Sequence, residues 1–550
     1  MTEREKTAGK AAGSKMAGAW LCIAVCFMLF LYAPLELLFT NQDEFWFDAC
    51  ILTPPMLVVF AAGCGCGILL FALLGKLHEK LYRLGLMAGF VGYIGLYVQG
   101  NFLAAGLPSL DGEPIDWSLY SGERIKSVIA WAAVAAVVIT LFCKLRGEVF
   151  ARVVRVVSIG MTLMLGLTLL TLAVTNDGFS KKPGMSVTTE NMFDMSRDTN
   201  FVILLLDAVD AQTLEGMMEA EPEYQDIFTD FTFYNNVVAA YPYTQHSIPY
   251  ILSGSWYENE KAFKAYEKEA YASSPFLETM ENAGYRMGFY EAELLPDNGG
   301  MGRFENILSN DRGVEDTWAF VRWQMLMTGF KYAPYDLKRF SFVNPKAFST
   351  LKITPEGKTL FTPSNIAFYD GVLHEELRTG DQKCFRFIHV DGGHVPFIYN
   401  ENVEEIPEES GSYEDNLRAC LTMTKAYLKK LREGGVYDNS VIIVMADHGY
   451  NWLDPHGRQN PAFFVKGVNE THDFAVSDAP VSFEDLQEAY QRLLNGADGG
   501  SVFDWKSGDQ RDRRFLFYEY LKEDYMVEYI QPGQAHDTEA MYETGNIFSR

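Results

Sequence analysis

The 550 residues exceed what one hydrophobic core usually supports, so the sequence predicts at least two structural units. The first third of the chain is apolar with few acidic residues, and the remainder holds most of the Asp and Glu behind the net charge of -26. This acidity disfavours a nucleic-acid partner, which requires clustered basic residues, and the uneven composition favours a membrane part followed by a water-soluble part.

Five apolar stretches with almost no internal charge occupy the N-terminal part. They lie at about 17–39, 51–75, 82–106, 125–143 and 153–175. Each is long enough to cross ~30 Å of hydrocarbon as a helix. A buried globular helix is an alternative for any one stretch, but five in succession predict a transmembrane bundle. The first is too long for the core of a signal peptide and lacks a small-residue cleavage pattern, so we expect it to be retained.

Basic residues gather in alternate loops between these stretches. The N-terminal tail, the second loop and the fourth loop carry Arg4, Lys6, Lys10, Lys15, Lys76, Lys80, Arg83, Lys144, Arg146, Arg152 and Arg155. The first and third loops instead contain the acidic sequences NQDEFWFD and LDGEPID. Because basic loops stay in the cytoplasm, we expect a multi-pass protein of the cell membrane with a cytoplasmic N-terminus and an extracytoplasmic C-terminal part.

The expected division is a membrane domain at 1–176, a polar linker at 177–198 and an extracytoplasmic domain at 199–550. Six of the eight cysteines lie in or beside the spans, and Cys384 and Cys420 fall in the exterior domain. Cys384 opens an apolar strand, which favours a buried thiol over a disulfide. A domain of this size does not need a disulfide framework.

Apolar runs alternate with helical patterns in the exterior domain. The runs FVILLL (201–206), CFRFIHV (384–390), SVIIVMA (440–446) and PAFFVK (461–466) are typical of strands buried on both faces of a parallel sheet. Segment 413–433 has apolar residues three and four apart, which predicts an amphipathic helix. The sequence therefore predicts an α/β fold with a largely parallel central sheet, and ligands bind such sheets beyond the carboxyl ends of the strands.

The segment 315–340 mixes aromatic residues with basic ones. One interpretation is a helix that packs on its own domain. The other is an amphipathic element on the outer leaflet, where aromatic and basic side chains suit the membrane interface.

Three of the predicted strands end in acidic or imidazole side chains. Asp207 follows the first, His389 and Asp391 end the second, and Asp447 and His448 follow the third. Carboxylate oxygens and neutral imidazole nitrogens are ligands for a hard or borderline dication. A DHG sequence after a strand is a weak signal alone, because Asp often caps and Gly often turns. Together with LLLDAVD, it makes Asp207, Asp447 and His448 the primary candidates for a metal site.

The stretch YPYTQHSIPYILSG (241–254) places a threonine before an apolar run that begins a helix. Thr is a common N-cap, and Pro249 suits a first helical turn, so the stretch alone favours a capping role for Thr244. The alternative is a nucleophile, because coordination to a dication lowers the pKa of a hydroxyl and makes its alkoxide accessible near neutral pH. A helix N-terminus would also stabilise a transferred phosphoryl group.

The order FVILLLDAVDA, TQHSIPYILSG, HVDGGHVP and VMADHG resembles the sulfatase-like branch of the alkaline phosphatase superfamily over roughly residues 198 to 470. In sulfatases the nucleophile lies ten residues before a Gly within a C/S-x-P-S-R motif, and Thr244 lies ten before Gly254. The chain lacks both the Cys or Ser and the Arg of that motif. The formylglycine that sulfatases require cannot form here, which argues against sulfatase activity.

The T-x-x-S-x-P pattern, HVDGGHVP and the five spans look more like two membrane relatives: phosphoethanolamine transferases that modify lipid A, and lipoteichoic acid synthases. The resemblance implies metal ligation by Asp207, Thr244, Asp447 and His448, with Thr244 as the nucleophile that carries the phospho-enzyme intermediate. One departure matters. Both relatives have Glu where this chain has Asp207, which leaves metal binding intact and makes the substrate less certain.

Further histidines stand beside the predicted strand ends. The resemblance places His394 and His456 against the phosphoryl donor or, with His389 and Asp391, around a second ion. Arg458 is a candidate partner for a phosphate oxygen. The alternative for each histidine is an ordinary structural role.

The sequence therefore predicts a metal-dependent phosphotransferase that uses one divalent ion, Zn²⁺ or Mn²⁺, and leaves a second ion open. Thr244 would take phosphoethanolamine or glycerol phosphate from a phospholipid donor and pass it to an envelope glycan, lipid or polymer. Two other functions stay open. One is a phosphodiesterase or phosphatase that uses water as the acceptor, and the other is a non-enzymatic membrane sensor or lipid-binding protein.

Overall fold

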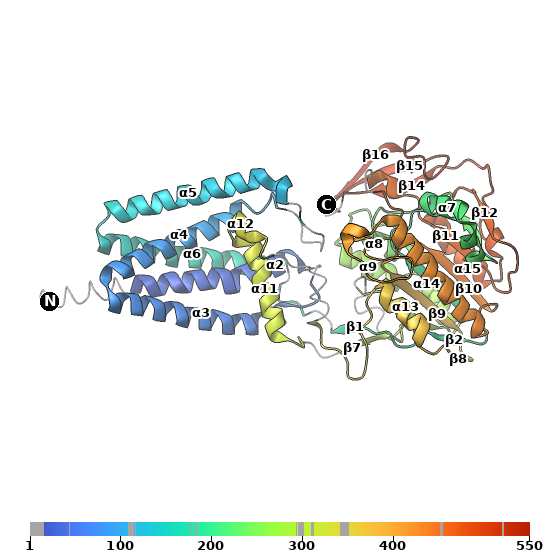
Figure 1. Cartoon of the computed structure of the whole chain (residues 1–550), viewed down its shortest axis with the longest axis horizontal. Coiled ribbons are helices and arrows are strands. Elements are labelled where there is room, and N and C mark those ends of the chain that lie inside the picture. The colour runs from blue at the N-terminus through green and yellow to red at the C-terminus, as the bar shows by residue number, and fades with distance from the viewer. Residues whose placement is uncertain are drawn as a thin grey trace, which may run out of the picture. The chain divides into compact units, whose positions relative to one another are not determined.

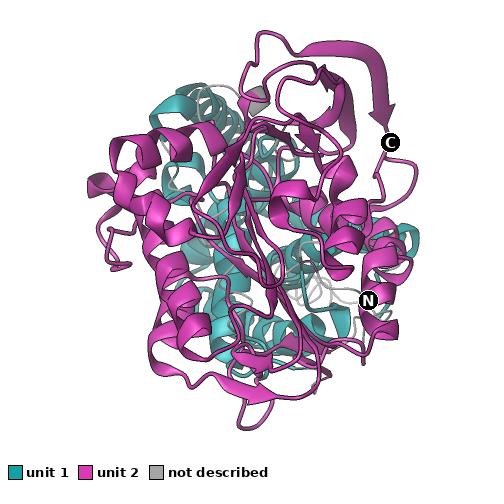
Figure 2. Ribbon diagram, turned by 90° about the vertical axis from the view of Figure 1, so that its right-hand side faces the viewer, with its two compact units in different colours: residues 1–182, 311–353 teal, residues 183–310, 354–550 magenta. Residues whose placement is uncertain are grey.

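The computed structural model describes residues 16–42, 45–107, 115, 117–176, 178–181, 184–292, 294, 302–309, 313–341, 351–451, 455–519 and 522–550, without the side chains of 455 and 456. The chain divides into two compact units (Figure 2). The first comprises residues 1–182 and 311–353, and the second comprises residues 183–310 and 354–550.

Five helices of the first unit are long and apolar enough to cross a membrane, as predicted. They are Met16–Thr40, Ala49–Leu77 (α3), Glu79–Phe102 (α4), Trp117–Lys144 and Gly147–Thr175 (α6). The first includes η1 (Met28–Tyr32) and α2 (Ala33–Thr40), and the fourth comprises η3 (Trp117–Tyr120) and α5 (Ser121–Lys144). The helices lie side by side in a bundle (Figure 1). Large apolar side chains such as Leu69 and Leu167 are exposed on it, which is typical of a surface that faces lipid.

Two further helices of this unit, α11 (Thr317–Tyr332) and α12 (Tyr335–Lys338), come from far along the chain. α11 contacts α2 and α4, and α12 contacts α5. The expected continuous domain at 199–550 is therefore interrupted by a segment that belongs to the first unit. The first interpretation of segment 315–340 is also wrong, because the helix packs with the spans rather than on the exterior domain. The reason lies in the apolar face of α11, where Phe320 and Met327 join the buried cluster formed by α2 and α3.

The second unit is built on a seven-stranded sheet. Its strands, in spatial order, are β12 (Ala475–Ser477), β4 (Thr232–Tyr234), β11 (Phe463–Lys466), β10 (Ser440–Met445), β3 (Asn200–Leu206), β9 (Cys384–Val390) and β6 (Arg286–Tyr290). The adjacent strands β10, β3, β9 and β6 are parallel, and β11 runs antiparallel to both of its neighbours. The predicted largely parallel sheet is confirmed.

Helices cover both faces of this sheet (Figure 2). They are α7 (Ala211–Ala220), α8 (Thr244–Ser253), α9 (Phe263–Ala272), α10 (Pro275–Asn282), α13 (Asn365–His374), α14 (Tyr413–Glu433) and α15 (Leu486–Leu494). Side chains alternate along β3: Phe201 packs on Phe276 of α10 and Tyr490 of α15, whereas Leu206 faces α14. A strand buried on both faces needs apolar residues at every position, which explains the continuous run at 201–206.

Smaller strands pair around this core. They are β1 (Met185–Val187) with β7 (Ile307–Ser309), β2 (Asp194–Ser196) with β8 (Arg378–Gly380), β5 (Val237–Val238) with β13 (Val481–Ser482), and the meander β14 (Arg513–Phe517), β15 (Tyr525–Gln531) and β16 (Tyr542–Ser549). The predicted linker at 177–198 therefore contains β1 and β2. Three-residue strands are too short to show a period of two, so the polar composition concealed them.

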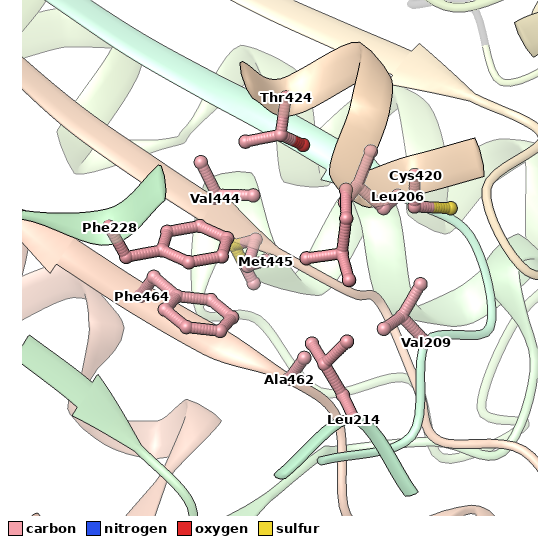
Figure 3. A pocket seen from close by; sticks show the side chains of 11 residues that line it. Leu206, Val209, Leu214, Phe228, Cys420, Thr424, Val444, Met445, Ala462 and Phe464 are labelled. Carbon is pink, nitrogen blue, oxygen red and sulfur yellow. The ribbon is translucent and has the colours of Figure 1, made fainter. Parts of the chain in front are cut away.

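A small apolar cavity of about 10 Å³ lies between α14 and strands β3, β10 and β11 (Figure 3). Its lining includes the free, buried thiol of Cys420. A cavity of this size barely admits one water molecule, and its apolar walls offer no partners to a polar ligand. It is a gap in the packing and lies apart from the groups that carry chemistry.

Candidate metal centre and nucleophile

The carboxyl end of β3 places Asp207 at the edge of the sheet. The next residue, Ala208, has φ +55°, a left-handed conformation that costs a non-glycine residue about 1 kcal/mol. Two contacts hold this turn: the Ala208 N–H donates to Asp447 Oδ1 (3.2 Å), and the Tyr413 hydroxyl donates to the Ala208 carbonyl (2.7 Å). The strained turn fixes the direction of the Asp207 carboxylate.

Asp207, Asp447 and His448 form a buried cluster whose ligand atoms all lie within 4.8 Å of one another. The register that pairs Met445 with Leu205 brings the ends of β10 and β3 together and so explains the cluster. His448 Nε2 lies 3.6 Å from Asp207 Oδ1 and 3.5 Å from Asp447 Oδ2. The sequence prediction that these three residues converge is confirmed.

The donor set fits a divalent cation. His448 Nδ1 lies 2.7 Å from the Gly449 carbonyl oxygen, so this nitrogen carries the proton and Nε2 presents a lone pair to the cluster. Asp207 Oδ1 and Asp447 Oδ2 are buried and have no hydrogen-bond partner among the described residues. Buried carboxylate oxygens left in this way are costly unless a cation or proton satisfies them.

Thr244 stands at the start of α8 and contacts this cluster. Its Oγ1 lies 3.3 Å from Asp207 Oδ2. The N-cap of α8 is Tyr243, and it makes no side-chain cap bond, so Thr244 is the first helical residue. The capping interpretation of Thr244 is therefore wrong, as is the placement of Pro249 in the first turn, because Pro249 lies inside the helix. The helix ends at Gly254, whose φ of +70° is a left-handed conformation that suits glycine.

The electrostatics of the cluster are unequal. Burial alone would raise the pKa of Asp207, but the facing imidazoles of His394, His389 and His448 outweigh it and hold that pKa well below its usual range. Burial and the neighbouring Asp207 charge raise the pKa of Asp447. The pKa values of the two carboxylates are therefore shifted in opposite directions, because both carboxylates compete for the same neighbouring imidazoles. A dication would supply positive charge to both carboxylates.

A carboxylate that sequence patterns did not reveal, Glu291, lies behind the cluster. It follows β6 directly and is bonded to His389 Nδ1, while His389 Nε2 lies 3.5 Å from Asp207 Oδ2. Burial alone would lower the pKa of His389, but the neighbouring Glu291 and Asp207 raise it by more. Its pKa therefore lies well above the usual value for a histidine. The signal in the sequence was the short apolar run MGFY ending in an acid, the same form as the other strand ends.

The remaining predicted site residues are His394, Arg458, Asp391 and His456. His394 is half-buried and interacts electrostatically with Asp207. Arg458 lies with its guanidinium carbon 4.7 Å from the centre of the Tyr243 ring, next to the nucleophile. Asp391 accepts a bond from the Tyr399 hydroxyl (3.2 Å). The backbone of His456 lies in η7 (Pro455–Arg458), and its side chain lies outside the described residues.

Some solved structures resemble the chain at low similarity. They include Ps i-CgsB in complex with k-i-k-neocarrahexaose (13% identity, 61% of this chain and 82% of that chain, TM-score 0.38), a protein in the alkaline phosphatase superfamily from Vibrio parahaemolyticus (12%, 66%, 85%, 0.35) and the lipoteichoic acid synthase LtaP from Listeria monocytogenes (11%, 66%, 88%, 0.35). Such distant likenesses carry no argument about function. No curated protein matches the chain significantly.

A model of one protein family does match the chain. It is described as Sulfatase and aligns with residues 199–486, more than half of the sequence. The matched segment contains Asp207, Thr244, Asp447 and His448, together with all seven strands of the main sheet. The chain therefore belongs to the sulfatase family.

Proposed function

We propose that this protein is a membrane-anchored, metal-dependent phosphotransferase that moves a phospholipid headgroup through a phospho-threonine intermediate. One observation carries the proposal. Thr244 Oγ1 lies 3.3 Å from Asp207 Oδ2, at the N-terminus of α8 and against a buried cluster of two carboxylates and one imidazole.

Asp207, Asp447, His448 and Thr244 are the residues that would hold the cation. A divalent ion bound there lowers the pKa of the threonine hydroxyl and neutralises charge on the phosphoryl oxygens. Zn²⁺ and Mn²⁺ both accept oxygen and imidazole ligands, so the donor set does not favour either. His389 Nε2 lies 3.5 Å from Asp207 Oδ2, the same oxygen that Thr244 contacts, and would help to orient it.

The first half-reaction transfers the headgroup phosphate to the enzyme. Thr244 Oγ1 attacks phosphorus as its proton leaves toward Asp447, the carboxylate of the cluster whose pKa is raised and which also contacts Thr244. A bond forms between Oγ1 and phosphorus, and the bond from phosphorus to the diacylglycerol oxygen breaks. We assign to His394, which interacts electrostatically with Asp207, the role of giving that oxygen a proton. The free N–H groups at the start of α8 favour the negative charge that develops on the phosphoryl group.

The second half-reaction returns the enzyme to its starting state. A hydroxyl or amine of an envelope glycan, lipid or polymer attacks the phosphorus, and the Oγ1–phosphorus bond breaks. Thr244 regains its proton. The transferred group is phosphoethanolamine or glycerol phosphate, and the five-helix anchor keeps the site near its lipid donor. The charges of the loops between the spans favour an extracytoplasmic position for this site.

The side chain at the nucleophile position separates this proposal from sulfate-ester hydrolysis. A threonine cannot be converted to formylglycine, because its β-carbon already carries a methyl group. The same centre with water as the acceptor would give a phosphodiesterase, and the experiment below distinguishes the two.

The full chain, purified with metal, is incubated with phospholipid vesicles and examined by intact-protein mass spectrometry. We expect an added mass at Thr244 that identifies the transferred group. Thr244→Ala should show none, whereas the exposed Thr471→Ala should match the wild-type protein. Asp447→Asn should lose bound metal and the adduct, and the exposed Asp438→Asn should keep both.

Two results would count against the proposal. A metal-loaded and active preparation that never carries an adduct contradicts the covalent intermediate. Release of the free headgroup at the same rate with and without an acceptor lipid or glycan identifies a hydrolase instead.

A further inference from the structure

The segment 311–353 interrupts the second unit and packs on the first, at one end of the helix bundle. Lys331 Nζ lies 2.6 Å and 2.7 Å from the two carboxylate oxygens of Glu36, which lies in the first turn of α2 and near the end of the first span. Tyr332 packs so closely on Gly100 of α4 that a β-carbon added there would lie 2.4 Å from the ring. We call residues 313–341 of this segment the docked insertion.

The docked insertion lies at the end of the bundle where α2, α4 and α6 end. Spans alternate in direction, so α2, α4 and α6 all end on one side, and α5 begins on that side. The contacts of the insertion lie at these same ends, and the chain enters the second unit after α6. The surface around the insertion therefore belongs to the membrane face at which the chain leaves α6.

A cavity of about 270 Å³ lies between the docked insertion and the start of α5. Its lining residues are Trp117, Ser118, Arg124, Tyr335, Asp336 and Arg339. The walls are fixed in place: the Tyr335 N–H donates to Ser127 Oγ (3.2 Å), its hydroxyl donates to the Trp117 carbonyl (3.0 Å), and the rings of Tyr335 and Trp117 meet edge to face at 5.5 Å. The cavity is thus a built feature of the first unit.

The charges in this cavity have both signs. Arg124 Nε lies 2.7 Å from Asp336 Oδ1, and Arg339 Nε donates to the Asp336 carbonyl (3.1 Å). Guanidinium groups bind phosphate oxygens through paired N–H donors. A simple anion in this cavity would be attracted by the two arginines and repelled by the Asp336 carboxylate. A ligand that carries a cation beside its phosphate avoids this loss, because the ammonium pairs with the carboxylate and lies over the aromatic rings.

We propose that this cavity binds the headgroup of a zwitterionic phospholipid, a phosphodiester that carries a primary amine. Trp117 and Tyr335 suit this position, because aromatic side chains with a polar edge collect at headgroup level. The use of that lipid as the phosphoryl donor rests on the proposed function, whereas the binding site itself does not require it.

Binding is measured with the full-length protein in detergent, by titration with dihexanoyl phosphatidylethanolamine, dihexanoyl phosphatidylglycerol and inorganic phosphate. We expect the amine lipid to bind the wild-type protein most tightly, and Arg339→Gln to weaken it about tenfold. Arg322→Gln removes an exposed arginine from α11 of the same insertion and should leave binding unchanged. Asp336→Asn should weaken the amine lipid and not the glycerol lipid.

Two controls keep the result interpretable. Ser118→Trp adds bulk at the exposed rim of the cavity and should abolish binding even if Arg339→Gln folds poorly. Lipid binding by the wild-type protein without a phospho-threonine adduct contradicts the proposed function alone. Equal affinity of the amine lipid for wild-type, Arg339→Gln and Ser118→Trp proteins would overturn the site. Competition by inorganic phosphate at the same affinity as the lipid would overturn the lipid assignment.

Discussion

Asp207 is held from two sides. Its Oδ2 accepts a hydrogen bond from the Thr244 hydroxyl, and His389 connects the same oxygen to Glu291 through one imidazole ring. Carboxylate–imidazole pairs of this kind orient metal ligands and set the charge around them. The arrangement gives Glu291 a part in the chemistry although it does not touch the nucleophile.

Glu291→Gln tests this positioning role. The amide still reaches His389 but lacks the charge that favours the imidazolium, so Asp207 loses part of its support. We expect the rate of phospho-Thr244 formation to fall about 10- to 100-fold, with protein stability less affected. The rate is measured by mass spectrometry with metal content determined in parallel, and Glu291→Asp should recover part of it.

The control for this variant is Glu278→Gln, which removes an exposed carboxylate from α10. It should form the adduct at the wild-type rate. If Glu291→Gln also does so, the pair serves only to fill the core, and Asp207 needs no support from behind.

At the scale of elements, the loop after β9 approaches β3 more closely than a side chain allows. Gly392 has φ +57°, and a β-carbon added to it would lie 2.4 Å from the Asp207 nitrogen and 2.6 Å from its carbonyl oxygen. Asn365 fixes the loop, because its side chain accepts from the Gly392 N–H (2.8 Å) and donates to the Gly392 carbonyl (2.9 Å). The glycine lets the loop that carries His394 lie against the metal cluster.

Gly392→Ala should therefore damage both stability and the site. The left-handed backbone costs alanine about 1 kcal/mol, and the overlap with the Asp207 backbone adds to this. We expect a lower melting temperature and weaker metal binding, measured by thermal unfolding with and without added metal. Gly216→Ala is the matched control, since Gly216 lies within α7 with open space around it. That variant should be about 0.5–1 kcal/mol more stable, and a similar gain in Gly392→Ala would show that the loop can move away from β3.

The elements that carry the centre could be predicted from the sequence because they are buried on both faces. Continuous apolar runs located β3, β9 and β10 almost to the residue, and the polar residues after them located the metal cluster. Glu291 could not be predicted from the sequence, because the strand before it contains a run of only four apolar residues. The packing of the docked insertion on the spans could not be predicted for a different reason. An amphipathic pattern shows that a helix has an apolar face and does not show which partner covers it.

At the scale of the whole molecule, the chain joins its two units at three places rather than one. It passes from the spans to the second unit after α6, returns at about 310, and leaves again at about 353. No local pattern contains this information, because a break between domains is usually read from one change of composition. The membrane-facing unit is completed by a segment of the sulfatase-family region itself.

The orientation of the molecule decides whether the proposed centre meets its donor outside the cytoplasm, and two native thiols report on it. Cys50 lies in the first turn of α3 and Cys143 near the end of α5, and both are exposed. They therefore lie at opposite membrane faces. The loop charges predict that Cys50 is external. An impermeant maleimide should label the wild-type protein and Cys143→Ser in intact cells, and Cys50→Ser should be labelled only after the membrane is permeabilised.

Cys384 and Cys420 are buried and should not be labelled in the folded protein. Labelling of Cys50→Ser but not of Cys143→Ser in intact cells would show that the protein has the opposite orientation in the membrane. The second unit would then lie in the cytoplasm, where an extracytoplasmic envelope acceptor is out of its reach.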